Sequence, residues 1–178
     1  MDVIERYNLR MPQVAVSFLT RCLASSGREL SVNKISHELK SRGVSTSRET
    51  LSSLLSYYEE AYLVFSLGDL NRALADNPRS SSKVYSVDPG LFTAFSKAAS
   101  KEVGQSLETA VFNKLRRLAP VVRTGALARL TFEHEKKSHE IDFVMGDALL
   151  GDAYRLIQVS VDVTNPKTLQ REVSALAA

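Results

Sequence analysis

Two segments near the C-terminus contain the residues whose types and spacing suit catalysis. In residues 140–144 and 157–162, polar side chains alternate with apolar ones. Alternation with a period of two, together with β-branched residues, predicts two strands that each have one polar face. These polar faces comprise Glu140, Asp142, Gln158, Ser160 and Asp162. Carboxylates beside a short polar ladder suit a metal-dependent phosphodiesterase, but the same pattern fits the solvated face of an ordinary β-hairpin.

The composition indicates a globular protein and argues against disulfide-rich, Cys/His metal-binding and membrane-spanning classes. The 178 residues are 44% hydrophobic and 24% charged, which is typical of a globular chain. One cysteine and three histidines exclude an internal disulfide and a Cys/His metal framework. The net charge of +3 permits an acidic partner without requiring one. No apolar run approaches the roughly 20 residues that span a bilayer, and residues 1–10 lack the core of a signal peptide. We therefore expect a cytoplasmic protein with no membrane partner.

The first half predicts three short helices and a pair of strands. Apolar residues at helical spacing mark helices over 12–25 and 32–41, the second of which Ser31 can cap, and a third that starts at Ser45 or Ser47 and reaches about residue 60. Strand-like runs follow at 62–67 and 83–87. Cys22 lies on the apolar stripe of the first helix, so we expect a buried structural thiol. Three helices followed by a hairpin are typical of a winged helix-turn-helix. We assign this domain, with a connecting helix, to residues 1–100.

A winged helix that reads DNA inserts the N-terminus of its third helix into the major groove. Arg48 is the cation at that point, and the predicted wing loop adds Arg72 and Arg79. The rest of the solvent face is neutral to acidic, which is poor for contacts with phosphate. Sequence-specific DNA binding is therefore one alternative, and a protein-interaction or spacer module is the favoured one.

The second half predicts the order helix, strand, strand, strand, helix over residues 101–178. Glu108 lies at the buried edge of the helix 104–118. Asn165 caps the last helix, and its apolar stripe of Leu169, Val173 and Leu176 is expected to face inward. Residues 114–137 contain seven Lys or Arg against two Glu, a surplus of five positive charges. That surplus fits either a solvated surface or a phosphate-facing rim, with Lys136 and Lys137 as candidate nucleic-acid-binding residues.

This order of elements, with carboxylates on the first helix and the middle strand, resembles the PD-(D/E)XK nuclease superfamily, the restriction-endonuclease-like fold. At family level, the chain resembles the C-terminal half of prokaryotic predicted AAA-type ATPases. The segments that carry this resemblance are residues 2–8, 31–35, 57–65, 83–91, 107–112, 140–144, 157–159 and 165–173. In that family a P-loop ATPase precedes a winged helix and a restriction-endonuclease-like domain of unknown function.

The resemblance implies an ATP-binding domain upstream, and this chain contains no G-x-x-x-x-G-K-[ST] motif. The chain therefore looks like an excised C-terminal fragment of such a protein, or like a protein that has lost the ATPase domain. The superfamily also usually places a further strand after the last helix. We accordingly expect the domain 101–178 to be truncated at its C-terminus, and the fold class to be α/β (α+β).

The resemblance also maps the nuclease positions onto Glu108, Asp142, Gln158 and Ser160. The first two would be ligands of Mg²⁺ or Mn²⁺. Gln158 keeps an oxygen but loses the charge, and Ser160 stands where a lysine would stabilise the developing charge on phosphorus. Lys114 or Lys136 are the candidates for a migrated lysine. We expect Asp162 to be a strand-end charge and Glu172 an exposed helix residue, and neither to be a ligand. His134 and His139 are expected to be exposed.

Three functions follow as alternatives. The first is a non-catalytic or degenerate nuclease-like module that binds nucleic acid or a protein partner. The second is an active metal-dependent nuclease, and the third is a protein-interaction scaffold. DNA, a protein bound through the winged helix and a second copy of the chain are the partners considered. We expect no cofactor beyond Mg²⁺ or Mn²⁺ at Asp142, with ATP bound only by an upstream domain.

Overall fold

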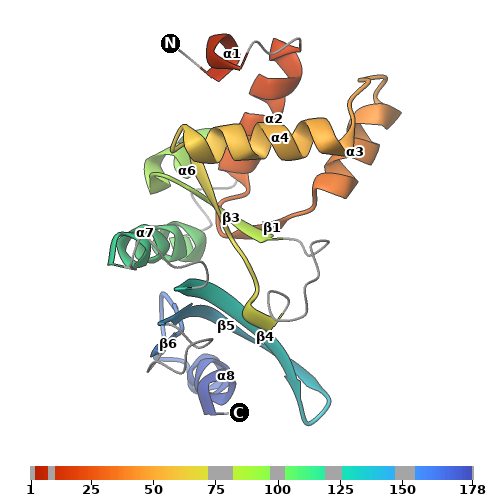
Figure 1. Ribbon diagram of the computed structural model, residues 1–178. Coiled ribbons are helices and arrows are strands. Elements are labelled where there is room, and N and C mark those ends of the chain that lie inside the picture. The colour runs from red at the N-terminus through yellow and green to blue at the C-terminus, as the bar shows by residue number, and fades with distance from the viewer. Residues whose placement is uncertain are drawn as a thin grey trace. The chain divides into compact units, whose positions relative to one another are not determined.

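The computed structural model describes residues 3–7, 11–71, 82–96, 103–118, 126–146 and 155–177. The fold is a mixed α/β arrangement with two small antiparallel sheets (Figure 1). The chain divides into two compact units, and each is described by itself. The first contains Met1–Ser66 and Ser81–Lys101, and the second contains Leu67–Ser80 and Glu102–Ala178.

The helices of the first unit begin where the sequence predicts them. Ser31 and Ser47 accept hydrogen bonds from the backbone amides of Lys34 (3.3 Å) and Thr50 (3.1 Å), which caps α3 and α4. The predicted helices over 12–25, 32–41 and 47–60 are thereby confirmed to within a few residues. The elements are α1 Val3–Arg6, α2 Pro12–Ala24, β1 Arg28–Leu30, α3 Val32–Ser41, α4 Arg48–Glu60, β2 Val64–Leu67, β3 Ser82–Ser86 and α6 Pro89–Phe95.

The sheet of the first unit has one strand more than the predicted hairpin. β1 pairs antiparallel with β3, with Arg28 opposite Val84, so the strand order is β1-β3-β2. Gly27 precedes β1 with a φ of 76°, and its amide donates to the carbonyl of Val84 at 2.8 Å. Three residues are too short to show a period of two, which is why the sequence pattern does not predict β1.

The core of the first unit lies between α2, α4 and the sheet. Phe18, Cys22, Leu51 and Val84 are each at most 1% exposed. Tyr58 is buried among them, and its hydroxyl donates to the carbonyl of Ala15 at 2.6 Å. The buried structural thiol expected at Cys22 is confirmed, and burial raises its pKa from 9.0 to about 12.

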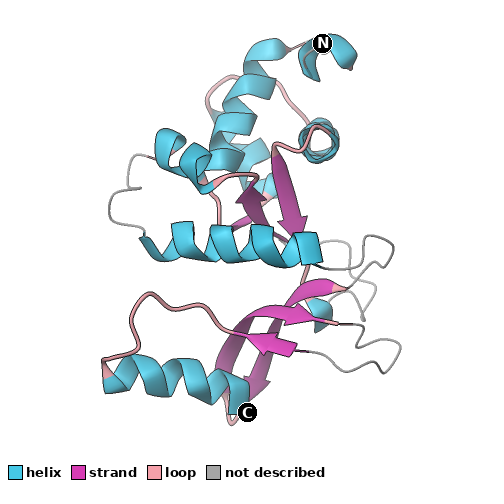
Figure 2. Ribbon diagram, turned by 90° about the vertical axis from the view of Figure 1, so that its left-hand side faces the viewer, coloured by secondary structure: helices cyan, strands magenta, loops and turns pink. Residues whose placement is uncertain are grey.

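The second unit is a three-stranded sheet between two helices (Figure 2). Phe112 of α7 lies 6.2 Å, between ring centroids, from Phe143 of β5 on one face. Ala175 of α8 packs with Ile141 and Val144 on the other face. The elements are α7 Val103–Leu118, β4 Leu127–His134, β5 Lys137–Met145, β6 Arg155–Ile157 and α8 Pro166–Ala177, with strand order β4-β5-β6.

The orientation of α8 differs from the sequence-based expectation. Leu169, Val173 and Leu176 were expected to face inward, but they are 45%, 49% and 39% exposed. Instead the neighbouring stripe, with Ala175 buried and Glu172 half-buried, faces the sheet. The hydrogen bond from Gln158 to Glu172 lies on the same stripe as the buried Ala175, so a polar and an apolar contact together hold this face of α8 against the sheet.

Candidate functional site

A β-bulge places Asp142 inside the second unit. Ala128 pairs with Val144 and Leu130 pairs with Ile141, so β5 has one residue more than β4 across this step. The side chain of Asp142 is therefore not on an open polar face, and the residue is only 8% exposed. The expectation of a polar strand face at Asp142 is wrong because the bulge interrupts the alternation.

The second predicted strand, 157–162, ends at Ile157. Beyond that residue, β5 and the segment that follows β6 are no longer joined by backbone-to-backbone hydrogen bonds. Side-chain oxygens accept the backbone N–H groups instead. The amide of Asp142 donates to Oε1 of Gln158 at 3.3 Å, and the amide of Val159 donates to Oδ2 of Asp142 at 2.9 Å. The structure thus brings Asp142 and Gln158 together, and each uses a side-chain oxygen to accept a backbone N–H.

Glu172 is a member of this cluster that the sequence reasoning missed. Nε2 of Gln158 donates to Oε2 of Glu172 at 2.8 Å, and the Glu172 side chain is only 12% exposed. Arg171 pairs with the other carboxylate oxygen at 2.5 Å, and this hydrogen bond raises the pKa of the arginine. The expectation that Glu172 is an exposed helix residue is therefore wrong. The only sequence signal was its spacing of three residues from Ala175 on the helix.

Ser160 and Asp162 form a local turn. The hydroxyl of Ser160 donates to the carbonyl of Asp162 at 3.2 Å. The exposed carboxylate of Asp162 accepts from the amide of Thr164 at 2.7 Å, and hydrogen bonds from the Thr164 side chain and backbone lower the pKa of Asp162. Ser160, at the position where the sequence resemblance would place a lysine, thus contributes a neutral hydroxyl.

Glu108 lies on the face of α7 that is turned toward the same region. Gly104, Glu108 and Phe112 are spaced four residues apart, so they share one face of the helix. A Cβ on Gly104 would lie 3.8 Å from a methyl group of Val161, and Phe112 contacts Phe143. The half-buried Glu108 therefore faces the space between the end of β5 and the segment after β6.

We tested whether these residues fit a divalent metal ion. Among the described residues, no group of three or more His, Cys, Asp or Glu side chains is placed to hold one. The Oε1 atom of Gln158 and the Oδ2 atom of Asp142 each accept a hydrogen bond from a backbone amide. A hard divalent cation needs several converging oxygens, so this arrangement does not fit the expected Mg²⁺ or Mn²⁺ site.

One of the seven basic residues in segment 114–137, Arg129, is buried and ion-paired, so its charge does not contribute to a basic surface. It is 1% exposed, and its guanidinium lies 3.7 Å from Oδ2 of Asp69 and 3.7 Å from Oε1 of Glu140. The amide of Arg129 also donates to the carbonyl of Gly68 at 3.0 Å, which pairs the segment 68–69 with the free edge of β4. Arg129 therefore stabilises the second unit and is not part of a phosphate-facing surface.

The candidate nucleic-acid-binding residues that the structure describes are all exposed. Arg48 is the first residue of α4, Lys136 lies in the turn between β4 and β5, and Lys137 is the first residue of β5. Arg72 and Arg79 lie outside the described residues. The exposed side chains of α4 include Ser52, Ser56 and Glu60, which confirms the neutral to acidic solvent face expected of that helix.

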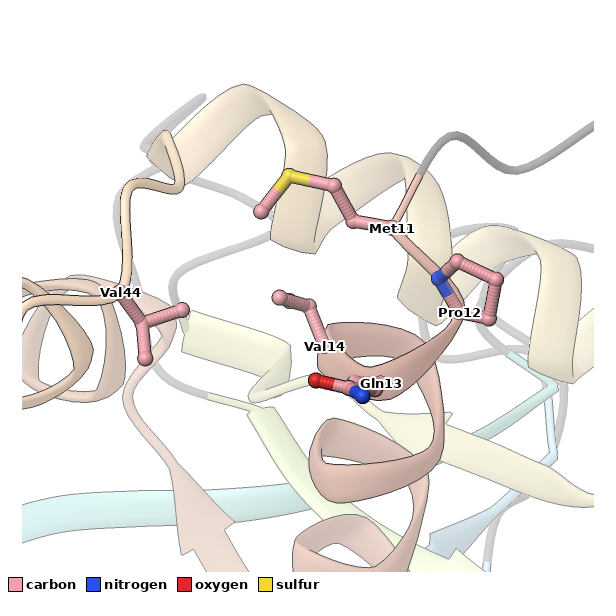
Figure 3. A pocket seen from close by; sticks show the side chains of 5 residues that line it. All are labelled: Met11, Pro12, Gln13, Val14 and Val44. Carbon is pink, nitrogen blue, oxygen red and sulfur yellow. The ribbon is translucent and has the colours of Figure 1, made fainter.

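The first unit also contains an apolar hollow of about 450 Å³. Met11, Val14 and Val44 point toward it in Figure 3, and Pro12 and Gln13 also line it. The lining residues that the structure describes include no acidic, basic or nucleophilic side chain.

Comparisons with known proteins place the chain in a sequence family. Its fold is a mixed α/β arrangement with two small antiparallel sheets. The chain belongs to the family described as "Domain of unknown function (DUF8612)", whose model matches residues 1–102. It is also 32% identical over 174 residues to "Uncharacterized protein MJ1544" of Methanocaldococcus jannaschii.

That match covers 98% of this chain and 36% of the relative, so the chain spans about a third of the relative's length. No solved structure matches the chain. None of the helices in the described part of the chain has the length and apolar character needed to cross a membrane.

Proposed function

We propose that this chain is a non-catalytic, nuclease-like module that binds nucleic acid. In this proposal residues 1–100 form a winged helix-turn-helix and residues 101–178 a restriction-endonuclease-like domain. The order α2–β1–α3–α4–β2–β3 supports the first assignment, because a winged helix combines three helices with a small sheet. The order α7–β4–β5–β6–α8 supports the second.

The contacts of Asp142 and Gln158 carry the non-catalytic part of the proposal. Both side chains bridge β5 and the segment after β6 through backbone amides, which is a structural role. Ser160 supplies no positive charge to stabilise a developing phosphorane. A nuclease site that keeps its fold but loses its charges is expected to use these positions for stability in this way.

The parent protein is proposed to be an AAA-type ATPase. The relative from Methanocaldococcus jannaschii is longer than the region that aligns, which leaves room for a further domain there. ATP binding would be a property of that domain, because the present sequence contains no P-loop.

An active metal-dependent nuclease is the second candidate. The observation that favours it is the position of Glu108 on the face of α7 turned toward β5. The third reading, a protein-interaction scaffold, is supported by the neutral to acidic solvent face of α4.

One pair of measurements separates these functions. The purified chain is incubated with supercoiled plasmid and Mg²⁺ or Mn²⁺, and its binding to a labelled duplex is measured in parallel. We expect binding that weakens as salt rises, because phosphate contacts release counterions, and no nicking. Nicking that is lost in Asp142→Ala would establish the nuclease instead. Absence of both binding and nicking would leave the protein-interaction scaffold.

A further inference from the structure

The tip of the β4–β5 hairpin is a two-stranded ribbon that extends past the rest of its sheet. β6 pairs only with Phe143–Met145, whereas β4 and β5 continue to pair as far as His134 and Lys137. Figure 1 shows the hairpin running on beyond β6 to its turn. Asp69 and Asn71 contact β4 as far as Thr131, so the three residues 132–134 give the free part of the ribbon a length of about 10 Å at about 3.3 Å per residue.

The register divides the charges between the two faces of this ribbon. Phe132 is opposite His139 and His134 is opposite Lys137, so these four side chains share one face. The other face contains the pairs Thr131–Glu140 and Glu133–Ser138. One face therefore has cationic and aromatic groups and no carboxylate, and both glutamates of the strands lie on the other.

The aromatic rings on the first face are held against one another. The Phe132 and His139 rings stack with centroids 5.4 Å apart and an interplanar angle of 20°, and His134 meets His139 edge-on at 6.4 Å. His134 and Lys137 are exposed. His139 is half-buried, and so is Phe132, which packs against the core cluster of the second unit and supports the two histidines from below. These contacts order the donor groups of the face before any ligand binds, which lowers the entropy cost of binding.

The turn at the tip is tightly constrained. Glu135 and Lys136 have φ values of 50° and 62°, so both central residues adopt the left-handed conformation of a type I′ turn. Glycine or asparagine is the usual occupant of these positions, and this turn instead places a lysine at the end of the ribbon.

We propose that the face formed by Phe132, His134, Lys137 and His139, with Lys136 at its tip, binds in the major groove of duplex DNA. This rests on the proposed nucleic-acid-binding function and names the surface and the substrate for it. The major groove of B-form DNA is about 12 Å wide and about 8.5 Å deep and admits a two-stranded ribbon. The ribbon is long enough to reach its floor.

The alternative nucleic acids fit this face less well. The major groove of A-form RNA is deep and too narrow for side chains to read. Single-stranded binding relies on aromatic rings that offer a free face to the bases, and here Phe132 and His139 stack on each other. Lysine and histidine N–H groups suit phosphates and the acceptor atoms of the groove. The strand residues of this face include no carboxylate, and the exposed Glu135 lies beside Lys136 in the turn.

The test is fluorescence anisotropy with the full 178-residue chain and a labelled 20-base-pair DNA duplex between 50 and 200 mM salt. The variant Lys136→Ala/Lys137→Ala removes two cations from the ribbon. We expect weaker binding and a slope of log affinity against log salt that is smaller by about 2, because each phosphate contact contributes about 0.9. His134→Ala should weaken binding with a smaller change of slope.

The matched control is Glu133→Gln/Ser138→Ala, which changes two exposed residues on the opposite face and should lose no affinity. Circular dichroism and a melting curve check that every variant folds. If the unaltered chain does not bind the duplex, the nucleic-acid-binding function itself fails. If it binds and the lysine variant binds equally well, only the hairpin inference is overturned. Equal affinity for a single strand or an RNA duplex would overturn the assignment to the DNA major groove.

Discussion

The Oδ2 atom of Asp142 accepts a hydrogen bond from the backbone amide of Val159, 2.9 Å away, at the point where β5 and β6 stop pairing. This bond joins the bulged strand to the chain segment that leads into α8. The carboxylate thus occupies the position of a missing main-chain acceptor. Asp142 is only 8% exposed, and this hydrogen bond is the way in which its buried carboxylate stabilises the fold.

Asp142→Ala is therefore expected to destabilise the second unit. The substitution leaves a half-buried amide without its acceptor, which costs about 1–3 kcal/mol. Urea denaturation followed by circular dichroism measures the loss. Asp142→Asn retains an oxygen at the same position and should lose less. If Asp142→Ala unfolded at the same urea concentration as the unaltered protein, the hydrogen bond between Asp142 and Val159 would contribute nothing to stability.

Gln158→Glu introduces the acid that the sequence resemblance would place at this position, and it is expected to destabilise the protein. The amide nitrogen of Gln158 donates to Glu172 at 2.8 Å, and a carboxylate there would replace a hydrogen bond with a repulsive contact. The free energy of unfolding should fall by about 1–3 kcal/mol at neutral pH.

The second substitution Glu172→Gln should recover most of that loss, because it returns one donor to the contact. The four proteins of this double-mutant cycle are compared by urea denaturation. Additive effects of the two substitutions would contradict direct coupling between residues 158 and 172.

Local patterns predict much of this fold. The helices α2, α3, α4 and α7 follow from apolar periodicity with caps at Ser31 and Ser47, because these signals lie within a few residues of each other. The N-cap at Asn165 is also confirmed, since its Oδ1 accepts from the amide of Lys167 at 2.9 Å.

The features that were missed depend on contacts between distant residues. The bulge at Asp142 follows from the register with β4, and the pairing of β1 with β3 joins residues more than 50 positions apart. The burial of Arg129 depends on Asp69, which is 60 residues earlier in the chain. No local pattern contains this information, so the sequence suggested a basic surface where the structure has an internal ion pair.

The outward stripe of α8 is expected to tolerate polar residues. Leu169 and Val173 are 45% and 49% exposed, so Leu169→Gln and Val173→Gln should each change the free energy of unfolding by only about 0.5 kcal/mol. Ala175 is buried against β5, and Ala175→Leu should cost about 1–3 kcal/mol through overpacking. Urea denaturation of the three variants checks this rotation of the helix. A larger loss for Leu169→Gln than for Ala175→Leu would mean that the stripe faces inward after all.

Cys22 should make the first unit sensitive to alkaline pH. Burial, followed by the charge of Glu59, raises the pKa of the thiol from 9.0 to about 12. Between these values the folded chain keeps a proton that the unfolded chain loses. Stability from this group is therefore complete below pH 9 and falls as pH rises toward 12, by at most about 1.4 kcal/mol per pH unit.

Urea denaturation at several values between pH 8 and pH 11 measures this loss. Cys22→Ala is the control, because it keeps Tyr58, whose pKa burial also raises, and removes only the thiol. The decline of stability with pH should be shallower in that variant. Native Cys22 should also react with a thiol reagent only as fast as the first unit opens. Parallel pH profiles for the two proteins, or rapid labelling of the native chain, would contradict a buried neutral thiol at this position.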